Sequence, residues 1–210
     1  MQFLKLIILL SLFSSLLQAK ELVLSEQEKA FIAAHPLLHV QNERTWAPID
    51  FREEGSAKGY AVDYIQLLAS KAGFKVKFIP GRSWNTYLTM VENKELDIIS
   101  SIKPTKQRKN YIDFTKEPIV KLINAVLQHQ DSPPITSTEE FTGKKIAVVQ
   151  GSYHEEYFKL YFPQTELVYA KDTLEAMRLV LSKKADAMIA YHSVNQYNIS
   201  RHLFSDLYST

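Results

Sequence analysis

Four short segments of the chain combine side chains that can hold a small polar ligand. They supply acidic, basic, hydroxyl, amide and aromatic groups, namely Glu43, Trp46, Ser101, Lys103, Arg108, Gln150, Gly151, Ser152, Tyr153 and Tyr191. An arginine can grip a carboxylate with two parallel hydrogen bonds. A Gly-Ser pair that opens a helix can present backbone N–H groups to an anion or a carbonyl. Aromatic side chains provide the flat walls of small-molecule pockets. The set suits a small ligand with at least one acidic group.

These residues also have structural interpretations that the sequence leaves open. Arg108 can cap or salt-bridge its own loop, and Glu43 can pair with the arginine that follows it. Trp84, a further aromatic candidate, lies on an apolar helical stripe, which by periodicity alone favours a core position. Lys103 can be a solvated loop charge, and Gly151-Ser152 can be an ordinary helix cap.

The elements that must position these segments follow one order twice. Apolar runs and helical spacing predict β-α-β-α-β in the first half, from strands at 38–40, 75–79 and 96–100 and helices at 60–72 and 84–91. The second half repeats this order, with strands at 145–150, 167–170 and 187–190 and helices at 153–162 and 173–181. Thr173 is the expected cap of the second of these helices. A final helix is predicted at 193–207.

Strands that alternate with helices indicate an α/β fold with parallel sheets. We expect two lobes, at 37–122 and 129–210, joined by a hinge strand at 123–128 and preceded by a helical lead-in at 20–36. One continuous doubly wound domain is the alternative. Ligands of open parallel sheets bind beyond the carboxyl ends of the strands. The candidate segments follow predicted strands, so two facing lobes would bring them to one cleft.

Residues 1–19 are typical of a secretory signal peptide. A single charge, Lys5, precedes an apolar run over 6–17, and a small residue, Ala19, stands at the expected cleavage point. An uncleaved membrane anchor is the alternative. The chain contains no cysteine, which excludes disulfides and thiolate chemistry and, with export, favours a bacterial periplasm.

Composition narrows the function classes. Lys plus Arg number 25 and Asp plus Glu number 23 among 210 residues, so no strong basic face predicts a nucleic-acid partner. The six histidines lack metal-ligand spacing, and no nucleophile elbow or phosphate-binding glycine loop is present. Glu155 and Glu156 are adjacent, so they point to different helix faces, and His154 and Glu155 are expected on the helix surface. No enzyme activity, cofactor or metal is therefore predicted.

Several motifs, in this order and spacing, resemble family 3 of the type 2 periplasmic solute-binding proteins. They span about 38–192 and include Thr-Trp-Ala-Pro-Ile-Asp-Phe at 45–51, Asp-Ile-Ile-Ser-Ser at 97–101, Thr-Lys-Gln-Arg at 105–108, the stretch 141–152 and Lys-Ala-Asp-Ala at 184–187. The resemblance implies a two-lobed clamp that closes on its ligand. It assigns the ligand carboxylate to Arg108, aromatic contacts to Trp46 and Trp84, an acidic position to Glu43 and a second-lobe contact loop to 150–153.

Two positions depart from the amino-acid binders of that family. Tyr191 stands where an acidic residue usually holds the ligand ammonium, and Lys103 stands where a small hydroxyl residue is common. Both changes make a more acidic or non-amino ligand plausible. The stretch 24–36 resembles the helical lead-in of sensor domains from histidine kinases and diguanylate cyclases.

The sequence therefore predicts an exported, monomeric, non-enzymatic clamp for a small carboxylate solute, amino-acid-like or more acidic, in ABC-type transport. A membrane permease or a sensor kinase is the expected protein partner. Two alternatives remain: the ligand-sensing domain of a truncated receptor, and a dehydratase-like lyase that uses Glu43 or His192. The return of the chain to the first lobe that the family leads us to expect is absent after 193–207, so we expect a truncated clamp.

Overall fold

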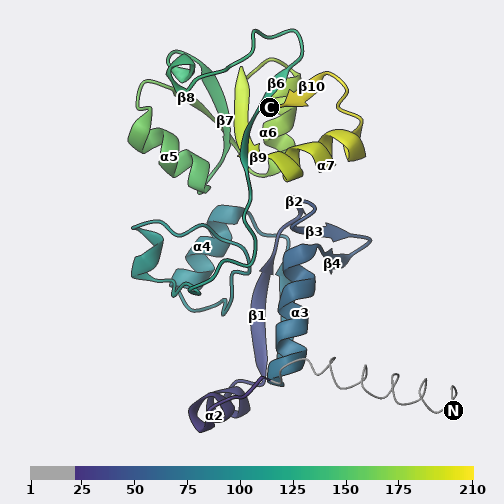
Figure 1. Cartoon of the computed structure of the whole chain (residues 1–210), viewed down its shortest axis with the longest axis vertical. Coiled ribbons are helices and arrows are strands. Elements are labelled where there is room, and N and C mark those ends of the chain that lie inside the picture. Colours follow the sequence, from purple (N-terminus) through teal and green to yellow (C-terminus); the bar gives the residue numbers. More distant parts are fainter. Residues whose placement is uncertain (1–21) are drawn as a thin grey trace, which may run out of the picture.

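The computed structural model describes residues 22–210, and the predicted signal peptide lies outside them. Two lobes are stacked along the long axis of the molecule (Figure 1). The first lobe contains the strands β1 to β5, and the second contains β6 to β10. None of the helices in 22–210 is long and apolar enough to cross a membrane. The lobes confirm the α/β clamp rather than one continuous domain.

The first lobe is built around a short parallel pair of strands. β1 (Leu37–Asn42) pairs in parallel with β5 (Lys75–Pro80). The helix α3 (Tyr60–Ala72) precedes β5 in the chain and ends at Gly73, which has a left-handed conformation. α4 (Trp84–Glu92) follows, capped by the Ser83 side chain. The strand predicted over 96–100 is wrong in extent, because only Ile98 forms a bridge, to Val40.

A small antiparallel sheet, absent from the sequence prediction, completes the first lobe. β2 (Thr45–Trp46), β3 (Asp50–Glu53) and β4 (Ser56–Lys58) form it in that order. The lead-in is α2 (Glu26–Ala34), whose first turn is closed by a reciprocal capping box between Ser25 and Glu28.

The second lobe contains a five-stranded sheet in the order β10-β6-β9-β7-β8. Its strands are β6 (Asn124–His129), β7 (Lys145–Val149), β8 (Glu166–Ala170), β9 (Ala187–Tyr191) and β10 (Leu207–Ser209). β7 pairs in parallel with β8 and β9, whereas β6 runs antiparallel to β9 and β10. Its helices are α5 (Tyr153–Tyr161), α6 (Thr173–Leu181) and α7 (His192–His202).

Three details of the second lobe differ from the prediction. The final helix, expected over 193–207, ends at His202, residues 203–206 form a turn, and Leu207 begins β10. Asp172 rather than Thr173 caps α6, because its carboxylate accepts from the backbone N–H of Glu175 at 2.9 Å. Most of the expected hinge strand coincides with β6, and the chain passes between the lobes just before it (Figure 1).

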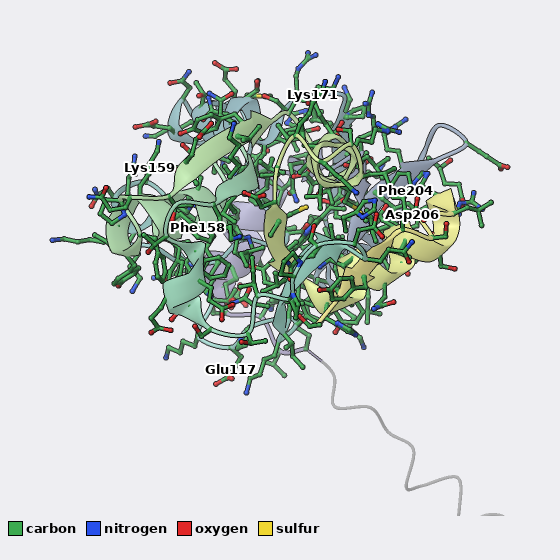
Figure 2. The ribbon with its side chains drawn as sticks, turned by 90° about the horizontal axis from the view of Figure 1, so that it is seen from above. Glu117, Phe158, Lys159, Lys171, Phe204 and Asp206 are labelled. Carbon is green, nitrogen blue, oxygen red and sulfur yellow. The ribbon has the colours of Figure 1, made fainter. Side chains whose placement is uncertain are left out.

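Apolar packing is concentrated in the second lobe. One cluster lies around α6 and includes Leu127, Met177 and Met188. Another includes Ile146 and Phe158, and lies under α5. Figure 2 views the molecule from above, with Phe158 and the exposed Lys159 labelled. A third, smaller cluster joins residues of both lobes. The second lobe is thus a packed scaffold against which the first lobe is positioned.

Candidate functional site

Arg108 lies buried between the lobes, at the start of a short 3-10 turn (Arg108–Asn110). Its Nη1 donates to the Lys103 carbonyl of its own loop at 2.9 Å. Its Nη2 donates to the Gly151 carbonyl at 2.9 Å and contacts Glu156 Oε1 at 2.9 Å. Burial lowers the pKa of Arg108, and the Glu156 carboxylate opposes that shift. Arg108 thus links the first lobe to β7 and α5 of the second.

Trp84 contacts the same carbonyl from the first lobe. Its indole Nε1 donates to the Gly151 carbonyl at 2.9 Å, and the ring centroid lies 5.9 Å from the Arg108 guanidinium carbon. Because Trp84 is the first residue of α4, the Ser83 cap fixes the direction in which the indole leaves the helix. The side chain is half-buried at the lobe interface, which is not the core position that periodicity alone favours.

Gly151 allows this close approach. Its φ is +77°, and an added Cβ would lie 3.1 Å from Asn85 Oδ1 in the first lobe. Ser152, the next residue, caps α5 by accepting from the Glu155 N–H at 3.2 Å. The predicted capping interpretation of Gly151-Ser152 is therefore confirmed, and the Gly151 carbonyl has an additional contact role across the interface.

Lys103 and Tyr153 approach each other above α5. The Lys103 Nζ lies 3.9 Å from the centroid of the Tyr153 ring, a cation–π contact between the lobes. Next to it, His154 Nε2 lies 3.1 Å from Asn124 Oδ1. Burial, with the charges of Lys103 and Arg108, lowers the pKa of His154 to about 4. The prediction that His154 and Glu155 lie on the helix surface is wrong, because both are buried.

Trp46 and Tyr191 form a second aromatic contact between the lobes. Their ring centroids are 5.8 Å apart in an edge-on arrangement. They pack on the interlobe cluster of Ile49, Ala61 and Val194. Burial raises the pKa of Tyr191. Trp46 thus faces an aromatic partner from β9, whereas Trp84 lies beside Arg108.

Acidic side chains gather near the end of β1. Asp50 is fully buried and accepts from Gln41 Nε2 at 2.8 Å and Asn42 Nδ2 at 2.6 Å, and burial raises its pKa to about 7. Glu43 is half-buried, and desolvation with repulsion from Asp50 and Asp172 raises its pKa to about 8. The alternative in which Glu43 pairs with the following arginine is not observed.

The remaining candidates lie around these contacts. Arg44 forms an ion pair across the lobes, with its Nη2 3.1 Å from Asp172 Oδ2. Ser101 is half-buried in the loop that leads to Arg108, and Gln150 is exposed with its N–H donating to the Ala170 carbonyl at 3.0 Å. The structure therefore brings together Trp84, Lys103, Arg108, Gly151 and Tyr153, with Trp46 and Tyr191 as a separate pair.

Sequence reasoning missed Glu156 and Asn85 at this interface. Glu156 lies in the first turn of α5, just after the Ser152 cap and the end of β7. Asn85 follows Trp84 and lies against Gly151. The roles of both residues depend on how the two lobes face each other, which no local sequence pattern indicates.

Comparisons with known proteins identify the family and the fold. Residues 38–177 match the model of bacterial extracellular solute-binding proteins, family 3. The virulence sensor protein BvgS of Bordetella pertussis is 23% identical over 184 residues, which cover 87% of this chain and 15% of BvgS. The arginine-binding extracellular protein ArtP of Bacillus subtilis is 27% identical over 120 residues, covering 57% of this chain and 46% of ArtP. The chain thus spans less than half the length of these relatives.

Solved structures share the fold. An ancestral arginine-binding protein bound to glutamine superposes with a TM-score of 0.76 at 24% identity, covering 84% of this chain and 78% of that one. The periplasmic VFT2 domain of Bordetella pertussis BvgS gives 0.76 at 22% identity, covering 89% and 79%. Proteins of this family and the related sensor domains are extracytoplasmic. From its motifs, its two lobes and its match over 38–177, the chain belongs to family 3 of the bacterial extracellular solute-binding proteins.

Proposed function

We propose that this chain is a periplasmic receptor that closes on a small, carboxylate-bearing solute and does not transform it. The observation that carries the proposal is Arg108, a buried guanidinium between the lobes with Trp84 beside it. A buried arginine offers planar, two-point recognition of a carboxylate. The Gly151 carbonyl and the Glu156 carboxylate reach it from the second lobe, so the ligand site and the closure contacts share one group.

Delivery of the solute to an ABC-type permease is the first role we propose. ArtP and the L-cystine-binding protein TcyJ of Escherichia coli, which are both named for a bound amino acid, match 57% and 56% of this chain. The permease would be the protein partner, and the receptor would act as a monomer. Ligand-dependent binding to a permease in membrane vesicles tests this role.

Ligand sensing is a second role, supported by the extent of the sensor matches. BvgS aligns over 87% of this chain, more than the amino-acid binders do. The lead-in helix α2 also precedes the region of the family match. A solute that alters kinase output when the chain is joined to a histidine kinase would favour this role.

A lyase is the competing proposal from another class. Its candidate groups are Glu43, whose burial raises the pKa to about 8, and His192, which is exposed at the start of α7. An ancestral amino-acid-binding protein described as a precursor of cyclohexadienyl dehydratase shares the fold at a TM-score of 0.71. Turnover of a prephenate-like acid by the purified chain would overturn the non-enzymatic proposal.

A thermal-shift screen of small acids and amino acids, followed by calorimetric titration, tests the assignment of Arg108. Arg108→Ala should weaken binding of the captured solute by about 30-fold or more, because losing one partner of a buried charge pair costs roughly 2–5 kcal/mol. Arg108→Lys keeps the charge but loses the fork, and Lys109→Ala is the matched control at an exposed neighbour. Unchanged affinity in folded Arg108 variants would remove Arg108 from the site.

A further inference from the structure

Glu156 occupies the place at Arg108 where a ligand carboxylate is expected. It is the fourth residue of α5, and its Oε1 lies 2.9 Å from Arg108 Nη2. The Arg108 side chain is 2% exposed and that of Glu156 is 30% exposed. The adjacent Glu155 is committed elsewhere, because it contacts Lys159 Nζ and accepts from the Gly151 N–H, each at 2.5 Å. Glu156 is therefore the acid of α5 that reaches the first lobe.

The contact leaves part of the guanidinium free. Arg108 Nε is buried and has no hydrogen-bond partner among the described residues. Nε–H and Nη2 lie on one edge of a guanidinium, and a carboxylate that binds this edge takes both N–H groups. Glu156 and Gly151 both contact Nη2, so the edge is only half used. Nη2 donates to the Gly151 carbonyl and is within ion-pair distance of Glu156, so a ligand carboxylate that takes Nε and Nη2 would compete with Glu156 for the same nitrogen.

The displacement has different consequences for two ligand classes. A simple acid would leave the partly buried Glu156 carboxylate unpaired beside a second anion, which is unfavourable because the like charges repel each other. A ligand with an ammonium group next to its carboxylate would offer Glu156 a new partner. The β9 position that often holds the ligand ammonium in this family is Tyr191 here, so the chain lacks an acid at that point. Glu156 instead approaches Arg108 from α5 of the second lobe.

We propose that Glu156 selects zwitterions: it pairs with Arg108 in the ligand-free protein and accepts the ammonium group once the ligand carboxylate has taken Arg108. This inference rests on the proposed function and makes its ligand class specific. It favours α-amino acids over simple acids, although Tyr191 alone suggested the opposite.

Matched ligand pairs test this role by calorimetric titration of the whole chain. The pairs are L-glutamine with 4-carbamoylbutyrate and L-arginine with 5-guanidinopentanoate, which differ only in the α-ammonium group. The wild type should prefer the amino acid by about 100-fold, and E156Q should reduce this preference to below about 10-fold, chiefly by binding the des-amino acids more tightly. E53Q is the matched control, because Glu53 also pairs across the lobes, with Arg201 at 3.1 Å. It should keep the wild-type preference.

The outcomes separate this inference from the proposed function. If folded E156Q keeps the wild-type preference, or if the wild type prefers the des-amino acids, Glu156 is not the selecting acid, while a carboxylate receptor that depends on Arg108 stands. If neither member of either pair binds the wild type, selection of these amino acids is overturned. The screen of other acids with Arg108→Ala then decides the proposed function independently. Thermal melting of each variant establishes that it is folded.

Discussion

The two lobes both bury apolar and polar side chains, but they group them differently. In the second lobe, the sheet is covered by two clusters of apolar residues that include Leu127, Met177 and Phe158. In the first lobe, the end of β1 buries polar groups instead: Gln41 and Asn42 donate to the fully buried Asp50. Apolar packing is non-directional, whereas buried polar networks require each partner to be in place.

This difference assigns the lobes different tasks. The second lobe supplies stability and a rigid edge from which the 150–153 loop and Glu156 project. The first lobe holds Arg108, Trp84 and the acidic group near β1, whose side chains depend on charge and hydrogen bonding. We therefore expect core substitutions in the second lobe to act on stability, and charge substitutions in the first lobe to act on pH response and ligand binding.

The largest expected effect is the loss of an apolar side chain from the second lobe. Phe158 is 1% exposed and packs edge-on against Phe141 at a centroid separation of 5.2 Å. Phe158→Ala should lower the free energy of unfolding by about 3–5 kcal/mol in urea titration, because it leaves a cavity. Leu160→Ala, on the same helix but 70% exposed, is the control and should change little. A loss below about 1 kcal/mol at Phe158 would contradict the scaffold role.

A smaller effect should appear in the pH dependence of the first lobe. Burial raises the pKa of Glu43 from 4.5 to about 8, so the folded state holds a proton that the unfolded state has released. Stability from this group is complete below pH 4.5 and is lost as the pH rises toward 8. Glu43→Gln should remove this loss, which we expect to be on the order of 2 kcal/mol.

Chemical unfolding at several pH values measures this slope. His154 in the second lobe has the opposite sign, because its lowered pKa makes stability fall as the pH drops from 6.5 toward about 4. A comparison above pH 6.5 therefore isolates the first lobe. Identical slopes for wild type and Glu43→Gln between pH 6.5 and 8 would show that Glu43 titrates as an exposed group.

The smallest effect is expected at the exposed pair between the lobes. Glu53 and Arg201 are 42% and 61% exposed. Glu53→Gln should change the free energy of unfolding by less than about 0.5 kcal/mol, because solvent screens such pairs. Thermal melting at low and high salt measures it. A loss above about 1 kcal/mol would mean that surface charges, and not the buried contacts at Arg108, hold the lobes together.

Local patterns predicted the helices and most strands, because Gly73, Ser83 and Ser152 are stop and cap signals that act over a few residues. Local patterns gave wrong predictions where pairing with residues distant in sequence determines the structure. Residues 207–209 form a strand because they pair with β6, some 80 positions earlier in the chain, and the 96–100 segment meets β1 only through the bridge from Ile98 to Val40.

The candidate site shows the same limit. Arg108 and the 150–153 loop were predicted from their places after strands and within motifs, and Trp84 from the family resemblance, and they meet in the structure. Glu156 was not predicted, because its role exists only when the second lobe faces Arg108. The burial of His154 likewise depends on Asn124 and Lys103, from segments that are not its sequence neighbours.

The carbonyl group of Gly151 accepts from Trp84 and Arg108 together. A carbonyl oxygen has two lone pairs, so both of its acceptor positions are in use. Two donors from different elements of the first lobe converge on one atom of the second, and this makes the Gly151 carbonyl a fixed point of contact between the lobes. Sliding one lobe along the other would break both bonds at once. If the chain closes on a solute as proposed, we therefore expect solutes of different size to be accommodated by side chains around this contact rather than by a shift of the lobes.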